Sequence, residues 1–170
     1  MTDVFSVRPA TVGDVDVLTR HRAEMFRDMG ALPALLYDAM CDASRLFFAR
    51  ALSDGEYLAW LASPVADPAQ VVAGAGLQLR SALPGIRRHD STVDVTTGLQ
   101  GLVLNVYTER PWRRRGLAAL LMKHVLEGAR LHHVGSLVLH ASPEGRPLYE
   151  SLGFVPTNEM RYAGALLPPG

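Results

Sequence analysis

The chain has 170 residues, of which 48% are hydrophobic and 20% charged, a composition typical of one globular domain with its own core. Because 17 Lys and Arg residues balance 17 Asp and Glu residues, the molecule has no net field that would attract nucleic acid or an anionic membrane. The single cysteine, Cys41, excludes an internal disulfide framework and a cysteine-rich metal site. We expect one domain over residues 1–170, with no metal and with neither nucleic acid nor membrane as partner.

Residues 1–5 have neither a basic leader nor an apolar run of signal-peptide length, and no run elsewhere reaches membrane-spanning length. Together with the single cysteine, this pattern predicts a cytoplasmic protein. The oligomeric state is not readable from the sequence, so a homodimer is left open.

The first half of the chain predicts a strand, two helices and further strands. Residues 4–8 alternate apolar and polar side chains before Pro9, as in a short strand. Thr11 is the expected N-cap of a helix that runs to about Met29 and is closed by Gly30. The next elements expected are a helix and two extended segments, at residues 36–52, 56–61 and 71–79.

The second half predicts an alternation of strands and helices after a long loop. Residues 81–98 are rich in Gly, Pro, Ser, Thr and Asp, and their lack of a strong period predicts a functional loop. A buried central strand is expected over residues 102–108 and a helix with a broad apolar face over residues 117–131. The last elements expected are a strand, a short helix and closing extended structure, at residues 136–140, 146–152 and 154–162. This order predicts a mixed α/β fold with a right-handed crossover through the helix after residue 116.

The most informative stretch is residues 113–116, Arg-Arg-Arg-Gly, between the central strand and that helix. A helix start exposes unpaired N–H groups and the positive end of the helix dipole, so acidic residues are normally favoured there. Each arginine at such a start works against the helix by about 0.3 to 1 kcal/mol, unless an anion lies between the arginines and the amides. We interpret the stretch as a pyrophosphate-binding site, the alternative being a solvated basic turn.

Two blocks of the sequence resemble one protein family. Residues 104–108 (Leu-Asn-Val-Tyr-Thr) and 113–118 (Arg-Arg-Arg-Gly-Leu-Ala) are similar to motif A of the GNAT superfamily of N-acetyltransferases, whose fingerprint is Gln/Arg-x-x-Gly-x-Gly/Ala. Residues 141–154 resemble its motif B, in which a tyrosine on a short helix precedes a Leu-Gly-Phe ending. The resemblance implies the acyl-CoA N-acyltransferase fold, an α/β (α+β) mixed sheet of about six to seven strands flanked by about four helices.

The resemblance also implies that the chain moves an acetyl group from acetyl-CoA to an amine. The residues implied to bind acetyl-CoA are Val106, Tyr107, Thr108 and Ser142 for the pantetheine arm, and Arg113, Arg114, Arg115, Gly116, Leu117 and Ala118 for the pyrophosphate. Ser142 stands where many relatives carry an asparagine, which weakens that contact. Gly116 has a physical reason to be small, because a side chain there would hold the phosphate away from the amides.

Tyr149 is the catalytic residue that the resemblance implies. Acetyl transfer from a thioester passes through a tetrahedral oxyanion, which the N–H of Val106 or a neighbour at a splayed strand edge would stabilise, and then releases a thiolate. Because the pKa values of a thiol and a phenol are about 8.5 and 10, full proton transfer from Tyr149 costs about 2 kcal/mol. The tyrosine is therefore a hydrogen-bond donor to the sulfur first, with a packing role as the alternative.

No convincing general base for the amine emerges. The candidates are His140, Glu109 and Glu24, or else a chain of water molecules. Cys41 lies outside both motifs, which favours direct transfer in a ternary complex. Arg22 and Phe26 on the first helix are the candidate acceptor-binding residues; Arg22 either lays its stem over the core or meets an acceptor carboxylate.

The expected function is acetylation of a primary amine on a small molecule or a peptide. One alternative is an aminoglycoside or polyamine acetyltransferase, which would need an acidic acceptor cleft; the sequence shows no acidic cluster. Another is a non-catalytic acyl-CoA-binding sensor that binds without turnover. Acceptor walls are expected from the first two helices and from residues 81–98.

Overall fold

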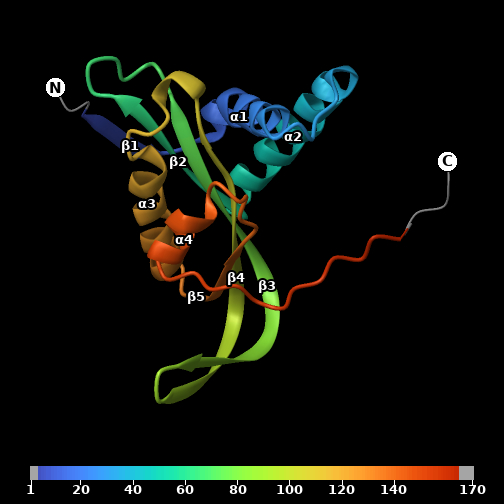
Figure 1. The fold of residues 1–170 in the computed structure, drawn as a ribbon, viewed down its shortest axis with the longest axis vertical. Helices are drawn as coiled ribbons and strands as arrows, with labels where there is room; N and C mark the ends of the chain where they lie inside the picture. Colours follow the sequence, from blue (N-terminus) through green and yellow to red (C-terminus); the bar gives the residue numbers. More distant parts are fainter. Residues whose placement is uncertain (1–3, 165–170) are drawn as a thin grey trace. The chain divides into compact units, whose positions relative to one another are not determined.

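A computed structural model describes residues 4–164, apart from the side chains of His89 and Thr97. The chain divides after His140 into two compact units, which are described separately below. Figure 1 shows the course of the chain and the labels of its helices and strands. In the part that the structure describes, no helix is both long and apolar enough to cross a membrane.

The first unit is built on a five-stranded sheet of order β1-β2-β3-β4-β5 (Figure 1). The strands are Phe5–Pro9 (β1), Tyr57–Pro64 (β2), Ala73–His89 (β3), Thr92–Thr108 (β4) and Val134–Leu139 (β5). Neighbouring strands are antiparallel except β4 and β5, which are parallel. Helix α3, Leu117–Leu131, connects the parallel pair and is the crossover helix that the sequence predicts.

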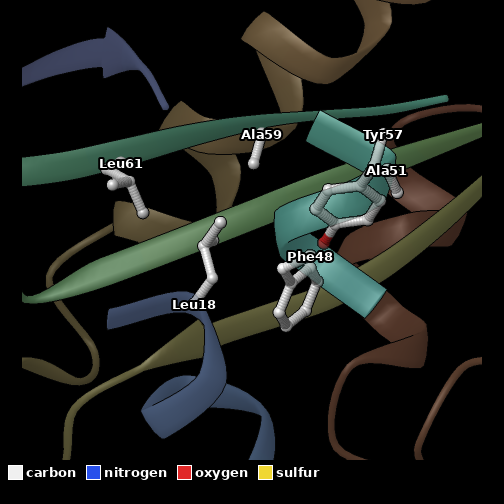
Figure 2. Close-up of a cluster of buried hydrophobic side chains, with 6 residues drawn as sticks. All are labelled: Leu18, Phe48, Ala51, Tyr57, Ala59 and Leu61. Atoms are coloured by element: carbon white, nitrogen blue, oxygen red, sulfur yellow. The ribbon is translucent and has the colours of Figure 1, made fainter. Parts of the chain in front are cut away.

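Helices cover both faces of this sheet. Helices α1 (Val15–Asp28) and α2 (Tyr37–Ser53) follow short 3-10 turns at Val12–Asp14 and Ala34–Leu36. Their core cluster consists of Leu18, Phe48, Ala51, Tyr57, Ala59 and Leu61 (Figure 2). Trp60, between Ala59 and Leu61 on β2, instead points at Gly128 of α3. Because successive strand residues face opposite sides, α1 and α2 cover one face and α3 covers the other.

Residues 81–98 form a β-hairpin, so the expectation of a long loop there is wrong. Pairing of β3 with β4 continues from Gly85–Thr96 to His89–Thr92, beyond an irregularity that begins at Ala82. The turn contains Asp90, whose φ of 49° lies in the left-handed region that aspartate tolerates. The Gly and Pro residues here accompany an irregularity in strand pairing and not a loop. Two strands can pair through backbone hydrogen bonds even when their side chains do not alternate between apolar and polar.

The second unit contains one short helix, α4, Arg146–Ser151, close to the predicted helix. The extended structure expected at residues 154–162 does not form a strand in the described part of the chain. Within the described residues the sheet has five paired strands, where six to seven were expected. A segment becomes a strand only when it pairs with a neighbouring strand. The segment that follows α4 has no such pairing among the described residues, and its apolar residues, such as Val155 and Met160, are exposed.

Candidate active site

Strand β4 separates from its parallel partner partway along its length. Its pairing with β5 ends at Val103–Leu139, whereas β4 itself continues to Thr108. In the same region the register of β4 on β3 shifts between Leu104 and Tyr107. A bulge of this kind bends a strand and ends pairing, so within the described first unit residues 104–108 have no β5 partner on this side and form an edge of the kind that pairs with an extended ligand.

Asn105 lies at the centre of this bulge. Its φ is 56°, a left-handed conformation that asparagine adopts more readily than other non-glycine residues. The side chain is 4% exposed and its Nδ2 donates to the carbonyl oxygen of Leu18 at 3.3 Å. Its Oδ1 has no partner among the described residues. The one signal of this role in the sequence is an amide side chain within an otherwise apolar strand.

The start of α3 has the features of an anion site. Gly116 is its N-cap residue with φ 80°, and Arg114, two residues earlier, has φ 63°. No side chain caps this helix start in the described structure, so the N–H groups of Leu117 and Ala118 are left for water or a ligand. The φ of 80° is what favours glycine here, because a Cβ at Gly116 would meet no atom within 4 Å and the space around it is open.

The three predicted phosphate arginines are not equivalent. The Nε of Arg113 donates to the carbonyl oxygen of Thr108 at 2.9 Å, and its guanidinium also forms an ion pair with Asp28. The guanidinium of Arg115 lies 4.8 Å from the ring centre of Trp112 and donates to the backbone of Pro111. The side chain of the residue between them is exposed. Arg113 therefore braces the turn, while the other two remain the nearer candidates for an anion.

Asp28, at the end of α1, was not predicted as a site residue. Its carboxylate accepts from Arg110 at 2.9 Å and 2.5 Å, from Arg113, and from the hydroxyl of Tyr107 at 3.1 Å. The hydrogen bond from Arg110, followed by those from Arg113 and Tyr107, lowers the pKa of Asp28 to about 2 despite burial. This carboxylate ties α1 to the segment that leads into α3.

In the second unit, Ser142 and Tyr149 belong to one turn and helix. The hydroxyl of Ser142 accepts from the N–H of Gly145 at 3.1 Å, just before α4. The ring of Tyr149 packs edge-on against Phe154 at 6.1 Å, and burial raises the pKa of its hydroxyl. Because that pKa is raised, the hydroxyl keeps its proton at neutral pH and can donate it in a hydrogen bond.

The candidate carboxylate bases are already engaged in the first unit. Glu24 forms an ion pair with Arg27 and accepts from the hydroxyl of Tyr37 at 2.8 Å. Glu109 lies 3.4 Å from Nε2 of His21, and this hydrogen bond is the main reason that its pKa is lowered. A carboxylate with a lowered pKa is a weaker base, which disfavours Glu109, and the contacts of Glu24 with Arg27 and Tyr37 already occupy its carboxylate. The remaining candidate, His140, follows β5 at the end of the unit.

A cavity of about 290 Å³ reaches the bulge of β4 on the face covered by α1 and α2. Its lining includes Arg22 of α1, Phe47 and Phe48 of α2, Tyr57 and Gln78 of the neighbouring strands, and Asn105. The guanidinium carbon of Arg22 lies 4.6 Å from the ring centre of Phe26, which does not itself line the cavity. The structure thus brings Arg22, but not Phe26, to the bulge.

Comparison with known proteins agrees with these features. A GNAT acetyltransferase domain model matches residues 96–166. A solved GCN5-related N-acetyltransferase from Ralstonia eutropha JMP134 is 31% identical, with 94% of this chain and 97% of that chain covered and a TM-score of 0.79. A predicted acetyltransferase from Clostridium acetobutylicum, solved with acetyl-CoA, is 24% identical over 95% and 96% of the two chains, with a TM-score of 0.78. An integron cassette protein from the mobile metagenome of Cole Harbour Salt Marsh is 25% identical over 96% and 91%, with a TM-score of 0.67.

Comparison with curated protein sequences finds no match. The similarity to the Ralstonia eutropha protein nevertheless extends over nearly all of both chains. The chain therefore belongs to the GCN5-related N-acetyltransferase (GNAT) family, and the expected fold class and resemblance are confirmed.

Proposed function

We propose that the chain transfers the acetyl group of acetyl-CoA to a primary amine of a small molecule or peptide, directly in a ternary complex. The observation that carries this proposal is that one unit combines a free β4 edge beyond Val103 with an uncapped start of α3. The first suits the amide-containing pantetheine arm and the second suits the diphosphate. The related Clostridium acetobutylicum structure, solved with acetyl-CoA, supports this choice of co-substrate.

Each of these features has its own proposed binding residues. The backbone of Val106, Tyr107 and Thr108 pairs with the pantetheine arm, and the N–H groups of residues 114–118 hold the diphosphate. Arg114 and Arg115 add positive charge there, while Arg113 shapes the turn through its bonds to Asp28 and Thr108. Ser142 is carried over from the family motif as a pantetheine contact and also caps the turn before α4.

The chemistry assigned to the chain needs only hydrogen bonds and water. Acetyl-CoA supplies a thioester whose carbonyl carbon accepts the amine nitrogen while its C–S bond breaks. The N–H of Val106 faces the negative charge that develops on the carbonyl oxygen, and Tyr149 donates to the departing sulfur. Because the candidate carboxylates are ion-paired, we assign the proton of the amine to water.

Two observations disfavour the alternative acceptor class and the alternative mechanism. The residues that line the cavity include no carboxylate among those described, which disfavours a polycation such as an aminoglycoside or a polyamine. Cys41 lies on α2 and does not line the cavity, which supports direct transfer over an acyl-cysteine route. A sensor that binds acetyl-CoA without turnover differs only in rate, so a rate measurement must separate it from an enzyme.

The test is release of the CoA thiol from acetyl-CoA, with a panel of primary amines and with amine-free samples as the baseline. We expect amine-dependent release together with formation of the N-acetyl product. Binding of acetyl-CoA without release for any amine would make the chain a sensor and contradict the proposal. Thiol release at the same rate with and without amine would indicate simple hydrolysis.

A further inference from the structure

One cation in the cavity, Arg22, lacks a counter-ion among the described residues. Two of the three arginines of α1 are paired, Arg20 with Glu109 at 2.5 Å and Arg27 with Glu24. Arg22 lies between them in the sequence and has neither a hydrogen bond nor an ion pair within the described part of the chain. Burial lowers the pKa of its guanidinium. Since a desolvated charge is costly unless it is paired, this arginine is placed for an anion.

Two buried polar atoms in the same lining also lack hydrogen-bond partners within the part of the chain that the structure describes. The hydroxyl of Tyr57 is on a side chain that is 1% exposed, and Oδ1 of Asn105 is on one that is 4% exposed. Tyr57 packs beside Phe48 (Figure 2), and the charge of Arg22 acts on its hydroxyl, which places the two groups close together. Buried polar groups are normally hydrogen-bonded, so a ligand that satisfies both would be favoured.

The unpaired atoms divide into donors and an acceptor. Arg22 only donates, and the Tyr57 hydroxyl has a proton to donate, so both suit a carboxylate. Nδ2 of Asn105 is used by Leu18, which leaves its Oδ1 as an acceptor for the N–H of an amine. This Oδ1 lies on the β4 bulge, where the acetyl-transfer function proposed above puts the thioester.

The rest of the cavity limits the size and charge of the ligand. Phe47, Phe48 and Leu104 give it apolar walls, and its volume of about 290 Å³ is at the small end for ligand pockets. Its lining holds one cation among the described residues, which balances one negative charge and not the two of a phosphate. A compact zwitterion with an apolar body fits these conditions.

We propose that the acceptor is a small amino acid with an apolar side chain, its carboxylate bound by Arg22 and Tyr57 and its amine oriented by Asn105. This proposal rests on the acetyl-transfer function proposed above. The ammonium group of the zwitterion first gives one proton to water. The amine nitrogen then bonds to the acetyl carbon, the thioester C–S bond breaks and the second N–H proton passes to the thiolate, giving an N-acetyl amino acid, the CoA thiol and one proton in solution. Arg22 determines specificity and does not touch the reacting atoms.

The experiment compares three pairs of amines that differ only in the carboxylate, with acetyl-CoA saturating. The pairs are phenylalanine and phenethylamine, leucine and isopentylamine, and methionine and 3-(methylthio)propylamine. We expect kcat/KM for thiol release to be at least about tenfold higher for the amino acid in at least one pair. In Arg22→Gln that ratio should fall to near one, and in Tyr57→Phe, which removes only an unpaired hydroxyl, it should fall several-fold.

Arg27→Gln is the matched control, because Arg27 is an exposed arginine of the same helix paired with Glu24, and it should keep the ratio. Equal kcat/KM within every pair, or a preference that survives Arg22→Gln, would overturn the acceptor class while acetyl transfer stands. If no amine is acetylated, the proposed function fails. Thermal melts of the protein with CoA, with and without each amino acid or amine, then test the carboxylate-binding site by itself. A carboxylate-dependent rise in Tm that Arg22→Gln abolishes supports it, and no such rise overturns it.

Discussion

The pKa values of Tyr149 and Asp28 are shifted in opposite directions. Burial raises the pKa of the Tyr149 hydroxyl, whereas hydrogen bonds led by that from Arg110 lower the pKa of Asp28 to about 2. A phenol with a raised pKa is a poor full acid toward a thiolate but remains a good hydrogen-bond donor. The first residue is therefore suited to assisting a leaving group, and the second to holding two segments together.

Replacing Tyr149 with Phe should lower kcat by about 100-fold, because the hydroxyl proton that stabilises the departing sulfur is lost. The rise in Tm caused by acetyl-CoA should persist, since the ring and its contact with Phe154 are kept. Steady-state kinetics and a melt on the same samples test both parts. Loss of the acetyl-CoA effect together with activity would show that the tyrosine is structural.

Replacing Asp28 with Asn should lower the free energy of unfolding at pH 7, because the carboxylate's ion pairs with Arg110 and Arg113 are lost. The decrease should be only about 1 kcal/mol, since both arginines are exposed and water screens their charges. The folded-state pKa is lowered, so this contribution is present above the unfolded pKa of about 3.9 and is lost as pH falls toward about 2. Denaturant melts from pH 7 to pH 3 should show the two proteins converging.

Asp42→Asn is the control for that series, since among the described residues Asp42 makes only an exposed ion pair with Arg45 at 3.4 Å. It should change stability little at any pH. A difference between wild type and Asp28→Asn that stays constant down to pH 3 would show that the carboxylate charge is not the cause.

Site residues that lie close together in the sequence could be predicted from it, whereas those that only the fold brings together could not. Gly116 and its neighbours were predictable because a helix start and its anion site lie in one short run. Asp28 was not, since it is 79 residues from Tyr107 and only the fold brings them together. The same holds for Tyr57 and Asn105, whose lack of partners is visible only once the cavity is formed.

At the level of elements, local signals predicted helices better than strands. The predicted bounds of α3 agree with Leu117–Leu131, because an apolar stripe and a glycine start are local features. The hairpin at residues 81–98 was missed because its exposed apolar side chains, such as Ile86 and Val95, show no buried alternation. Its strands are defined by pairing with each other, which sequence periodicity does not report.

The start of α3 gives an element-level prediction. Gly116→Ala should destabilise the protein by about 1 to 2 kcal/mol, because a Cβ disfavours the φ of 80°, and it should weaken acetyl-CoA binding by holding the diphosphate away from the amides. Gly30→Ala is the matched control, with φ 69° and equally open surroundings after α1. It should lose similar stability and keep its affinity, as melts and calorimetric titration would show.

At the scale of the whole molecule, the mixed α/β plan of the first unit was predictable, because the order of strands and helices follows from composition and period. The strand expected at residues 154–162 does not form in the described part of the chain, since its pairing depends on a partner strand and not on its own sequence. The central claim depends instead on two neighbouring features of the first unit, the free edge of β4 and the open start of α3.

That claim is tested most directly by thermal melting with and without acetyl-CoA. For a dissociation constant of about 1 μM, acetyl-CoA at about 100 μM would add about 2.7 kcal/mol and raise Tm by about 5 to 10 °C. S-acetylpantetheine, which lacks the diphosphate, should give a much smaller rise at the same concentration. An unchanged Tm at millimolar acetyl-CoA would contradict the proposed binding of acetyl-CoA at β4 and α3.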